Sequence, residues 1–298
     1  MTKLKFFKEI WKASRPLSLT LAFYSTTLGM AIAHLEEKLF TGRTYFDIKL
    51  IILVTLAGIF VQTATNFIND YFECEYKNLH FTGKKYNFFG QKRNYFDILI
   101  FNLGLLSFLI TALLGLWIIN LSTGKLFTIG FLGLIGGYAY TGEPIVYKKR
   151  GLGTPLSFVL MGPLMIMGTY LVFTQQYSWL PLVLGLPISL LIPVLMLSNE
   201  LRDFERDKSL GIKTLTVRIG FKNAKLLYLT LLSSSYLLTV IFVLTGYYPI
   251  STLSVVITIP LAVKAFKNVA QARKTGVPVT NQLHLSFGLL QLLALFLA

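Results

Sequence analysis

Two short stretches of the sequence concentrate side chains that could bind a metal ion through oxygen. Each contains an asparagine, an aspartate four residues later, and a further acid. The six residues are Asn66, Asp70 and Glu73 in NFINDYFE (66–73), and Asn199, Asp203 and Asp207 in SNELRDFERD (198–207). A helix turns by about 100° per residue, so each set would lie on one helix face. The spacing therefore predicts two one-faced sets of amide and carboxylate oxygens.

Oxygen ligands without nitrogen or sulfur suit Mg²⁺, which keeps several waters and is often completed by substrate phosphates. Paired Asp-rich helices that hold Mg²⁺ against a diphosphate would stabilise the charge that develops as an allylic diphosphate ionises. We therefore predict that all six residues are Mg²⁺ ligands, with Asp70 and Asp203 as catalytic residues. Acids at helix ends can also simply be solvated among lipid headgroups. Two matched copies weigh against that alternative, since carboxylates near membrane depth are usually functional.

A diphosphate needs basic partners besides metal ions. Arg15 directly precedes Pro16, and several basic residues follow the second acidic stretch. These are Arg202, Arg206, Lys213 and Arg218. Many basic residues would only anchor the chain at the membrane surface. We predict Arg15 and Lys213 as diphosphate contacts, and Asn66 and Asn199 as further substrate-binding residues. Lys148, Lys149 and Arg150 fit membrane anchors best, and Lys148 is predicted as the one of the three that reaches the substrate.

Long apolar segments must position these residues. The chain is 54% apolar and only 14% charged, whereas a soluble domain carries about 25% charged residues. A span needs about 20 mostly apolar residues, and nine stretches are predicted to be membrane helices. They are residues 17–34, 48–68, 97–120, 125–142, 155–174, 178–198, 225–246, 249–268 and 282–297.

The basic residues predict how the chain lies in the membrane. All but four of the 28 Lys and Arg residues fall on one side of a nine-helix chain, and the exceptions are Lys38, Arg43, Lys49 and Lys125. This asymmetry places the N-terminus and both acidic stretches in the cytoplasm, with the protein in the plasma membrane. We therefore expect the net charge of +15 to serve contact with anionic lipid headgroups, and we expect no binding of nucleic acid. No cleavable signal peptide is expected.

Longer motifs resemble a known family. Besides NDYFE (69–73), the chain contains YTGEPIVYKKRGLG (140–153), GPLMIMGTY (162–170) and NELRDFERDKSLGIKTLTVRIG (199–220). These stretches resemble the UbiA superfamily of membrane-embedded aromatic prenyltransferases, and most of all its 1,4-dihydroxy-2-naphthoate branch from menaquinone synthesis. Two positions depart from the pattern. Cys74 stands where much of the superfamily has Asp, and Glu143 stands where the branch usually has Gly.

The resemblance implies an all-α fold of nine transmembrane helices around a central cavity, forming one integral-membrane domain over residues 1–298. It implies an Mg²⁺-dependent enzyme that transfers a polyprenyl group from polyprenyl diphosphate to 1,4-dihydroxy-2-naphthoate, with loss of carbon dioxide and release of diphosphate. Tyr140 is predicted to be catalytic, by orienting the aromatic acceptor or stabilising the allylic cation through its ring. A tyrosine anchor at the membrane interface is the alternative for this residue.

Three other functions remain open from the sequence. A sister prenyltransferase would use 4-hydroxybenzoate, haem, a chlorin or glycerol phosphate as acceptor. A cation-coupled transporter would place its acids near the bilayer midplane, whereas these acids lie at helix ends. A structural membrane protein would leave the paired motifs without a role.

Overall fold

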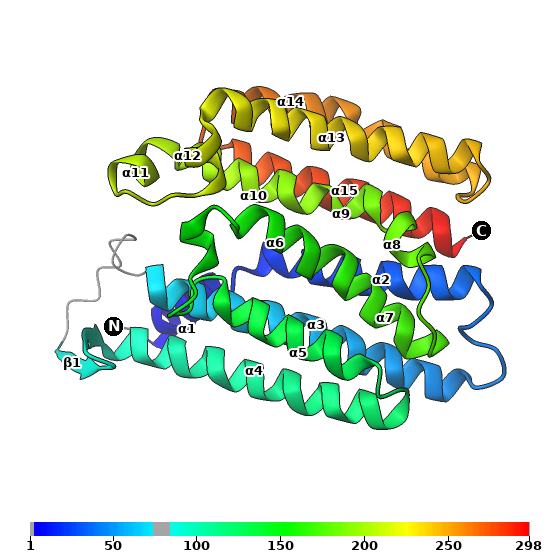
Figure 1. The fold of residues 1–298 in the computed structure, drawn as a ribbon, viewed down its shortest axis with the longest axis horizontal. Coiled ribbons are helices and arrows are strands. Elements are labelled where there is room, and N and C mark those ends of the chain that lie inside the picture. The colour runs from blue at the N-terminus through cyan, green and yellow to red at the C-terminus, as the bar shows by residue number, and fades with distance from the viewer. Residues whose placement is uncertain (1–2, 74–83, 298) are drawn as a thin grey trace.

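The protein is a bundle of helices (Figure 1). The computed structural model describes residues 3–73 and 84–297. Within these residues, seven helices or continuous helical runs are long and apolar enough to span a membrane. Five are single helices: α2 (Pro16–Leu35), α3 (Thr44–Glu73), α4 (Tyr95–Leu121), α13 (Phe221–Leu244) and α15 (Gly276–Phe296). The sixth is a continuous run of α6 (Gly153–Val159), a π-helical turn (Leu160–Leu164) and α7 (Met165–Thr174). The seventh is a run of a 3₁₀ helix (Ile250–Thr258) and α14 (Ile259–Ala270).

The predicted count of nine spans is therefore not confirmed. The fourth predicted span is α5 (Leu126–Ala139), whose 14 residues extend only about 21 Å, short of a hydrocarbon core of roughly 30 Å. The sixth is divided into α8 (Leu180–Leu184), α9 (Leu186–Ser189) and α10 (Leu191–Arg202). Pro187 and Pro193, near the starts of α9 and α10, explain the two breaks, because proline lacks the N–H that continues a helix.

Side chains from a neighbouring loop and helix satisfy carbonyl groups of this broken segment. The Tyr248 hydroxyl donates to the Leu184 carbonyl, and the Ser235 hydroxyl donates to the Pro187 carbonyl. Gln291 on α15 donates through Nε2 to the Tyr248 hydroxyl at 2.7 Å. Breaks in membrane helices are tolerated when neighbours pair the freed backbone groups in this way.

Helix α2 packs closely against α7 and α15 at glycine positions. A side chain at Gly29 would meet Thr169 of α7, since a Cβ there would lie 2.7 Å from the Thr169 Cβ. On α15, a Cβ at Gly288 would lie 2.4 Å from the Tyr24 ring of α2. Close backbone approach at such positions is how membrane helices pack without a hydrophobic driving force.

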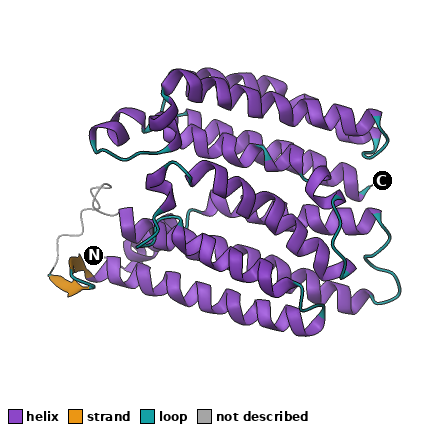
Figure 2. Ribbon diagram, in the orientation of Figure 1, coloured by secondary structure: helices purple, strands orange, loops and turns teal. Residues whose placement is uncertain are grey.

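One end of the bundle carries the short elements (Figure 1). They are α1 (Lys3–Ala13), the hairpin of β1 (Lys85–Phe88) and β2 (Gln91–Asn94), α11 (Phe204–Ser209) and α12 (Leu215–Ile219). The C-terminus lies at the opposite end. Figure 2 shows the hairpin as the strand pair of the described residues. Its two-residue turn has positive φ at both Phe89 and Gly90, as a tight hairpin of right-handed twist requires.

Candidate active site

A cavity of about 890 Å³ opens among α2, α3, α5, α10 and α15. Both acidic stretches reach it, although 133 positions separate Asn66 from Asn199. Nine of the ten predicted site residues line it: Arg15, Asn66, Asp70, Glu73, Tyr140, Lys148, Asn199, Asp203 and Asp207. The structure thus brings the two stretches to one space from opposite sides of the bundle.

Lys213 is the exception among the predicted site residues. Its side chain is exposed, and it is absent from the cavity lining. The neighbouring Ile212 faces the cavity instead. The stretch between α11 and α12 is a turn in which the Lys213 carbonyl accepts from Arg218 Nε at 3.2 Å. The sequence-based role of Lys213 as a diphosphate contact is therefore not supported by its position.

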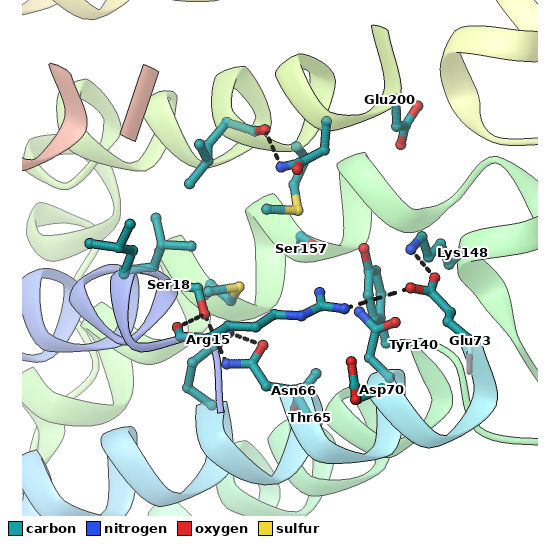
Figure 3. A pocket seen from close by; sticks show the side chains of 18 of the residues that line it. Arg15, Ser18, Thr65, Asn66, Asp70, Glu73, Tyr140, Lys148, Ser157 and Glu200 are labelled. Carbon is teal, nitrogen blue, oxygen red and sulfur yellow. Dashed lines mark hydrogen bonds and ion pairs between the residues drawn. The ribbon is translucent and has the colours of Figure 1, made fainter. Parts of the chain in front are cut away.

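Asn66 ties α3 to the start of α2 (Figure 3). Its Nδ2 donates to the Ser14 carbonyl and to the Ser18 Oγ, both at 2.8 Å. Its Oδ1 accepts a longer hydrogen bond from Gln62 Nε2, at 3.4 Å. The amide nitrogen of Asn66 thus holds the start of α2 in place. Its amide oxygen could bind a metal ion if the ion displaced Gln62.

Glu73 lies between two basic side chains at the end of α3 (Figure 3). Lys148 Nζ donates to its Oε1, and Arg15 Nη2 lies 3.6 Å from its Oε2. Asn69 completes the cluster: with its amide turned to suit its neighbours, it donates to Glu73 Oε2 at 2.7 Å and accepts from Arg15 Nη1 at 2.8 Å. Sequence reasoning missed Asn69, although its position four residues before Glu73 is a signal for shared helix faces.

The backbone before α2 aims Arg15 into the cavity. Arg15 is the N-cap residue of α2 and has φ 50° and ψ 64°, the left-handed region. That conformation costs a residue with a Cβ roughly 1–2 kcal/mol, and such strain gathers at functional sites. Val146, two residues before Lys148, is also left-handed with φ 44°. Left-handed backbone thus lies at Arg15 itself and two residues before Lys148.

The second acidic stretch does not form the single helix that its spacing predicted. Helix α10 ends at Arg202, Asp203 sits at the break with φ −96° and ψ 7°, and α11 starts at Phe204. The Asp207 N–H still donates to the Asp203 carbonyl at 2.9 Å, so the chain keeps helical spacing across the break. Both carboxylates therefore line the cavity, although they belong to different helices.

Arginines pair with both carboxylates of this second stretch. Asp203 Oδ2 lies 2.7 Å from Arg202 Nη2 and 3.0 Å from Arg206 Nη2, and Asp207 Oδ1 lies 2.9 Å from Arg206 Nη2. Burial alone would raise the pKa of Asp203, but the hydrogen bonds and charges of the two arginines outweigh it and lower the pKa. Burial raises the pKa of Asp207 against the pull of Arg206. Asp203 is thus held as an anion beside the cavity.

Asn199 presents its amide oxygen as an acceptor. Its Nδ2 donates to the Leu195 carbonyl at 3.0 Å, which fixes the orientation of the amide. In the part of the chain that the structure describes, no group donates to Asn199 Oδ1. Asn199 is half-buried, and an acceptor oxygen fixed in this way at the cavity suits a cation.

Tyr140, Tyr147 and Lys148 form an aromatic and cationic wall of the cavity. The rings of Tyr140 and Tyr147 meet edge to face at 5.5 Å, and Lys148 Nζ lies 5.5 Å from the centre of the Tyr140 ring. Burial alone would lower the pKa of Lys148, but the adjacent Tyr140 hydroxyl and Glu73 carboxylate outweigh it and raise the pKa. Burial raises the pKa of Tyr140. The wall therefore combines a stable ammonium with neutral rings.

Glu200 is buried next to the cavity but has a structural role. Its Oε1 accepts from Thr154 Oγ1 at 2.7 Å and its Oε2 accepts from the Thr216 N–H at 2.8 Å. These bonds join α6, α10 and the first turn of α12. The carboxylate is satisfied by these partners and needs no metal ion.

Glu200→Ala should therefore destabilise the fold. The change leaves a buried hydroxyl and a buried N–H without an acceptor, which costs about 3 kcal/mol in total, equivalent to a fall in melting temperature of roughly 5–10 °C. Thermal unfolding of the purified protein in detergent measures this. Glu205→Ala is the matched control, because Glu205 is exposed and should change stability by less than about 0.5 kcal/mol.

The oxygen ligands around the cavity fit Mg²⁺ when it arrives with a diphosphate. Among the described residues, no three His, Cys, Asp or Glu side chains gather as a ready-made metal cage. Mg²⁺ commonly uses only one or two carboxylates, with waters and phosphates completing its coordination. Asp70, Asp203 and the Asn199 oxygen face one cavity and supply such a set. Cys74 and Glu75, at the end of the first motif, lie outside the described residues.

A bundle of membrane-spanning helices with two acid-bearing helix ends on one cavity defines a class of membrane enzyme. The chain belongs to the UbiA prenyltransferase family, whose pattern it matches over residues 22–278. It is 29% identical over 264 residues to 1,4-dihydroxy-2-naphthoate octaprenyltransferase of Bacillus subtilis (strain 168), covering 88% of this chain and 82% of that protein. It is 28% identical over 288 residues to human UbiA prenyltransferase domain-containing protein 1, covering 96% of this chain and 82% of that one.

Solved structures of the family share the fold. A UbiA homologue from Aeropyrum pernix K1, without ligand, superposes with a TM-score of 0.66 at 16% identity, covering 90% of this chain and 96% of that one. A UbiA homologue from Archaeoglobus fulgidus, bound to GPP and Mg²⁺, superposes with a TM-score of 0.58 at 13% identity, covering 95% and 99%. The protein is therefore an integral membrane protein of the UbiA prenyltransferase family.

Proposed function

We propose that this protein transfers a polyprenyl group from polyprenyl diphosphate to 1,4-dihydroxy-2-naphthoate in menaquinone synthesis, and that the reaction needs Mg²⁺. The observation that carries the proposal is the meeting of both acidic stretches with Arg15 and Lys148 on one cavity. The similarity to the Bacillus subtilis naphthoate enzyme supports the acceptor. We also propose that the protein lies in the plasma membrane with this cavity open to the cytoplasm, following its basic loops.

The residues around the cavity divide into two chemical roles. Asp70 and Asp203, with Asn199 beside them, would hold Mg²⁺, and Asn66, Glu73 and Asp207 would complete its surroundings. Mg²⁺ bound there would neutralise the diphosphate as the allylic carbon–oxygen bond breaks. Arg15 and Lys148 now pair with the Glu73 carboxylate in this cavity. When the diphosphate binds, both cations would turn from Glu73 to a diphosphate oxygen. Charge-assisted contacts of this kind bind phosphates strongly.

The aromatic acceptor would meet the allylic carbon beside Tyr140. The Tyr140 ring is held between Lys148 and Tyr147, and its face could stabilise the allylic cation. The electron-rich ring of the acceptor attacks that cation, and its carboxylate leaves as carbon dioxide. A cation so formed must be shielded from water, and the buried wall of Tyr140 and Tyr147 would provide that shielding.

The prenyl tail would extend into a second, apolar cavity of about 390 Å³ between α3, α4, α5 and α7. Val61, Gly133, Leu160 and Met165 line both cavities, so the two spaces adjoin. The second cavity is lined by aliphatic side chains, glycines, threonines, a methionine and two phenylalanines. This composition suits a hydrocarbon chain, which gains about 0.8 kcal/mol for each buried CH₂ group.

Gly130→Leu should shorten the prenyl chain that the enzyme accepts. Gly130 lines the tail cavity and a Cβ there meets no atom within 4 Å, so a leucine would take up part of the space that the tail needs. We expect the ratio of long-chain to short-chain product to fall about tenfold, from one or two displaced CH₂ groups. Competition between two prenyl diphosphates, analysed by mass spectrometry, measures the ratio. Gly124→Leu, at an exposed glycine outside both cavities, should leave it unchanged.

A panel of acceptors tests the proposed substrate. Purified enzyme in lipid is given radiolabelled polyprenyl diphosphate, Mg²⁺ and one acceptor at a time: 1,4-dihydroxy-2-naphthoate, 4-hydroxybenzoate, haem, a chlorin or glycerol phosphate. We expect labelled lipid product with the naphthoate, of a mass that lacks the carboxyl group. Product with another acceptor and none with the naphthoate would assign the protein to a sister enzyme of the same family.

A further inference from the structure

Helix α1 carries two apolar faces, and the bundle covers only one of them. Phe6, Ile10 and Ala13 pack into a cluster with aromatic and aliphatic side chains of α3 and α4. Phe7 and Trp11, one helical turn apart, are 66% and 64% exposed. Two large aromatic side chains on a five-residue stretch of an already packed helix indicate a second, apolar environment.

Lysines flank the exposed aromatic face. Lys8 and Lys12 are also one turn apart and exposed, about 100° around the helix from Phe7 and Trp11. Around the axis, the packed face, the aromatic face and the lysine face follow in that order. Glu9 lies beyond the lysines and meets Lys12 at 2.7 Å. The helix sequence, KLKFFKEIWKA, holds four lysines and one acid, so its charge suits an anionic surface.

The chain after α1 fixes its depth in the membrane. Only Ser14 and Arg15 separate α1 from α2, the first membrane-spanning helix. Such a link extends at most about 10 Å, so α1 ends close to the membrane boundary. The left-handed backbone of Arg15 turns the chain there, which makes α1 a separate helix at the bundle end that carries α11 and the hairpin (Figure 1).

We propose that α1 lies in the plane of the membrane surface and binds anionic lipid. Phe7 and Trp11 sit at the boundary between headgroups and acyl chains, where aromatic rings are favoured. Lys8 and Lys12 contact anionic phosphates, each contributing about 1 kcal/mol. This lipid contact does not depend on the acceptor proposed above.

The position of α1 links this lipid contact to the cavity. Trp11 and Lys12 are exposed and also line the large cavity, so they stand at its opening. The Ser14 carbonyl, one residue after α1, accepts the hydrogen bond from Asn66. Anionic lipid on α1 would therefore hold one side of this opening.

Fluorescence of Trp11 tests the depth of α1. The full-length Trp117→Phe, Trp179→Phe variant keeps Trp11 as its tryptophan, since the chain has three. It is reconstituted in phosphatidylcholine vesicles containing one-third phosphatidylglycerol. We expect strong quenching by lipids brominated near the glycerol end of the acyl chain, weaker quenching by lipids brominated near the methyl end, and protection from acrylamide. Quenching by acrylamide as efficient as for N-acetyltryptophanamide, with none by brominated lipid, would overturn the proposal.

The contribution of charge is tested in the same background. Lys8→Gln with Lys12→Gln should lower the ratio of lipid-docked to undocked helix about 30-fold, or about 1 kcal/mol per lysine. Removal of phosphatidylglycerol should have the same effect on the unchanged lysines. Lys222→Gln with Lys225→Gln, at the start of α13, is the matched control and should leave Trp11 quenching unaltered. Equal quenching in all variants and both vesicles would refute anionic-lipid binding by α1.

Discussion

Asp70→Asn and Asp203→Asn should each lower kcat/KM for prenyl transfer by about 10³-fold, equivalent to roughly 4 kcal/mol of transition-state stabilisation. Each change replaces a carboxylate on the cavity with a neutral amide of the same shape, so the fold should persist. The loss should fall mainly on kcat, because the charge on the leaving diphosphate grows only as its bond to carbon breaks. Radiolabelled prenyl transfer in lipid measures both parameters.

Glu205→Gln is the matched control for these two variants. Glu205 is two residues from Asp203, but it is exposed and lies outside the cavity lining. Its loss removes the same charge from the same stretch and should alter kcat/KM by less than about twofold, as surface changes away from a site usually do. An equal loss in all three variants would mean that overall negative charge at this end of the protein matters, and not ligation in the cavity.

Lys148→Met should lower kcat/KM by about 10²-fold and raise KM for the prenyl diphosphate. The ammonium is held beside the cavity by Glu73 and the Tyr140 ring, and a hydrogen bond from a charged donor contributes about 1.5–3 kcal/mol. Methionine keeps an unbranched apolar side chain of similar length and removes the ammonium group with its charge and hydrogen bonds. Steady-state kinetics with varied prenyl diphosphate measures the change in KM.

Lys213→Met separates a cavity cation from a surface cation. Both lysines belong to the conspicuous basic segments of the sequence, yet only Lys148 lines the cavity. We expect Lys213→Met to keep wild-type KM and kcat within about twofold. A tenfold rise in KM for Lys213→Met, with Lys148→Met near wild type, would reverse the assignment of the two residues.

Side-chain spacing predicted the acidic and amide residues of the two stretches that meet at the cavity, but not Asn69. Asn66, Asp70 and Glu73 lie on one helix as their spacing indicates, because a long apolar helix continues past the membrane core to Glu73. The basic loops indicated that the two acidic stretches lie at the same end of the molecule. That the structure brings Asp70 and Asp203 to one cavity follows from these two patterns together.

Other features depend on packing that the sequence does not show. The break at Asp203 contains neither Pro nor Gly, so no local residue type predicts it. Lys213 falls outside the cavity because the turn before α12 directs Ile212 inward instead. The divisions between α8, α9 and α10 follow from visible prolines, but their tolerance depends on Tyr248 and Ser235, which lie about 50 or more residues away along the chain.

Binding of an unreactive prenyl thiodiphosphate, measured by calorimetry with and without Mg²⁺, tests most directly whether the two acidic stretches form one metal–diphosphate site. Binding of two ligands at a shared site is coupled, and the coupling is reciprocal. We expect Mg²⁺ to tighten analogue binding by about 10²-fold in the wild-type protein, and to have no effect in either Asp70→Asn or Asp203→Asn. Analogue binding that is independent of Mg²⁺ in the wild type, or coupling that survives in both variants, would contradict a shared site.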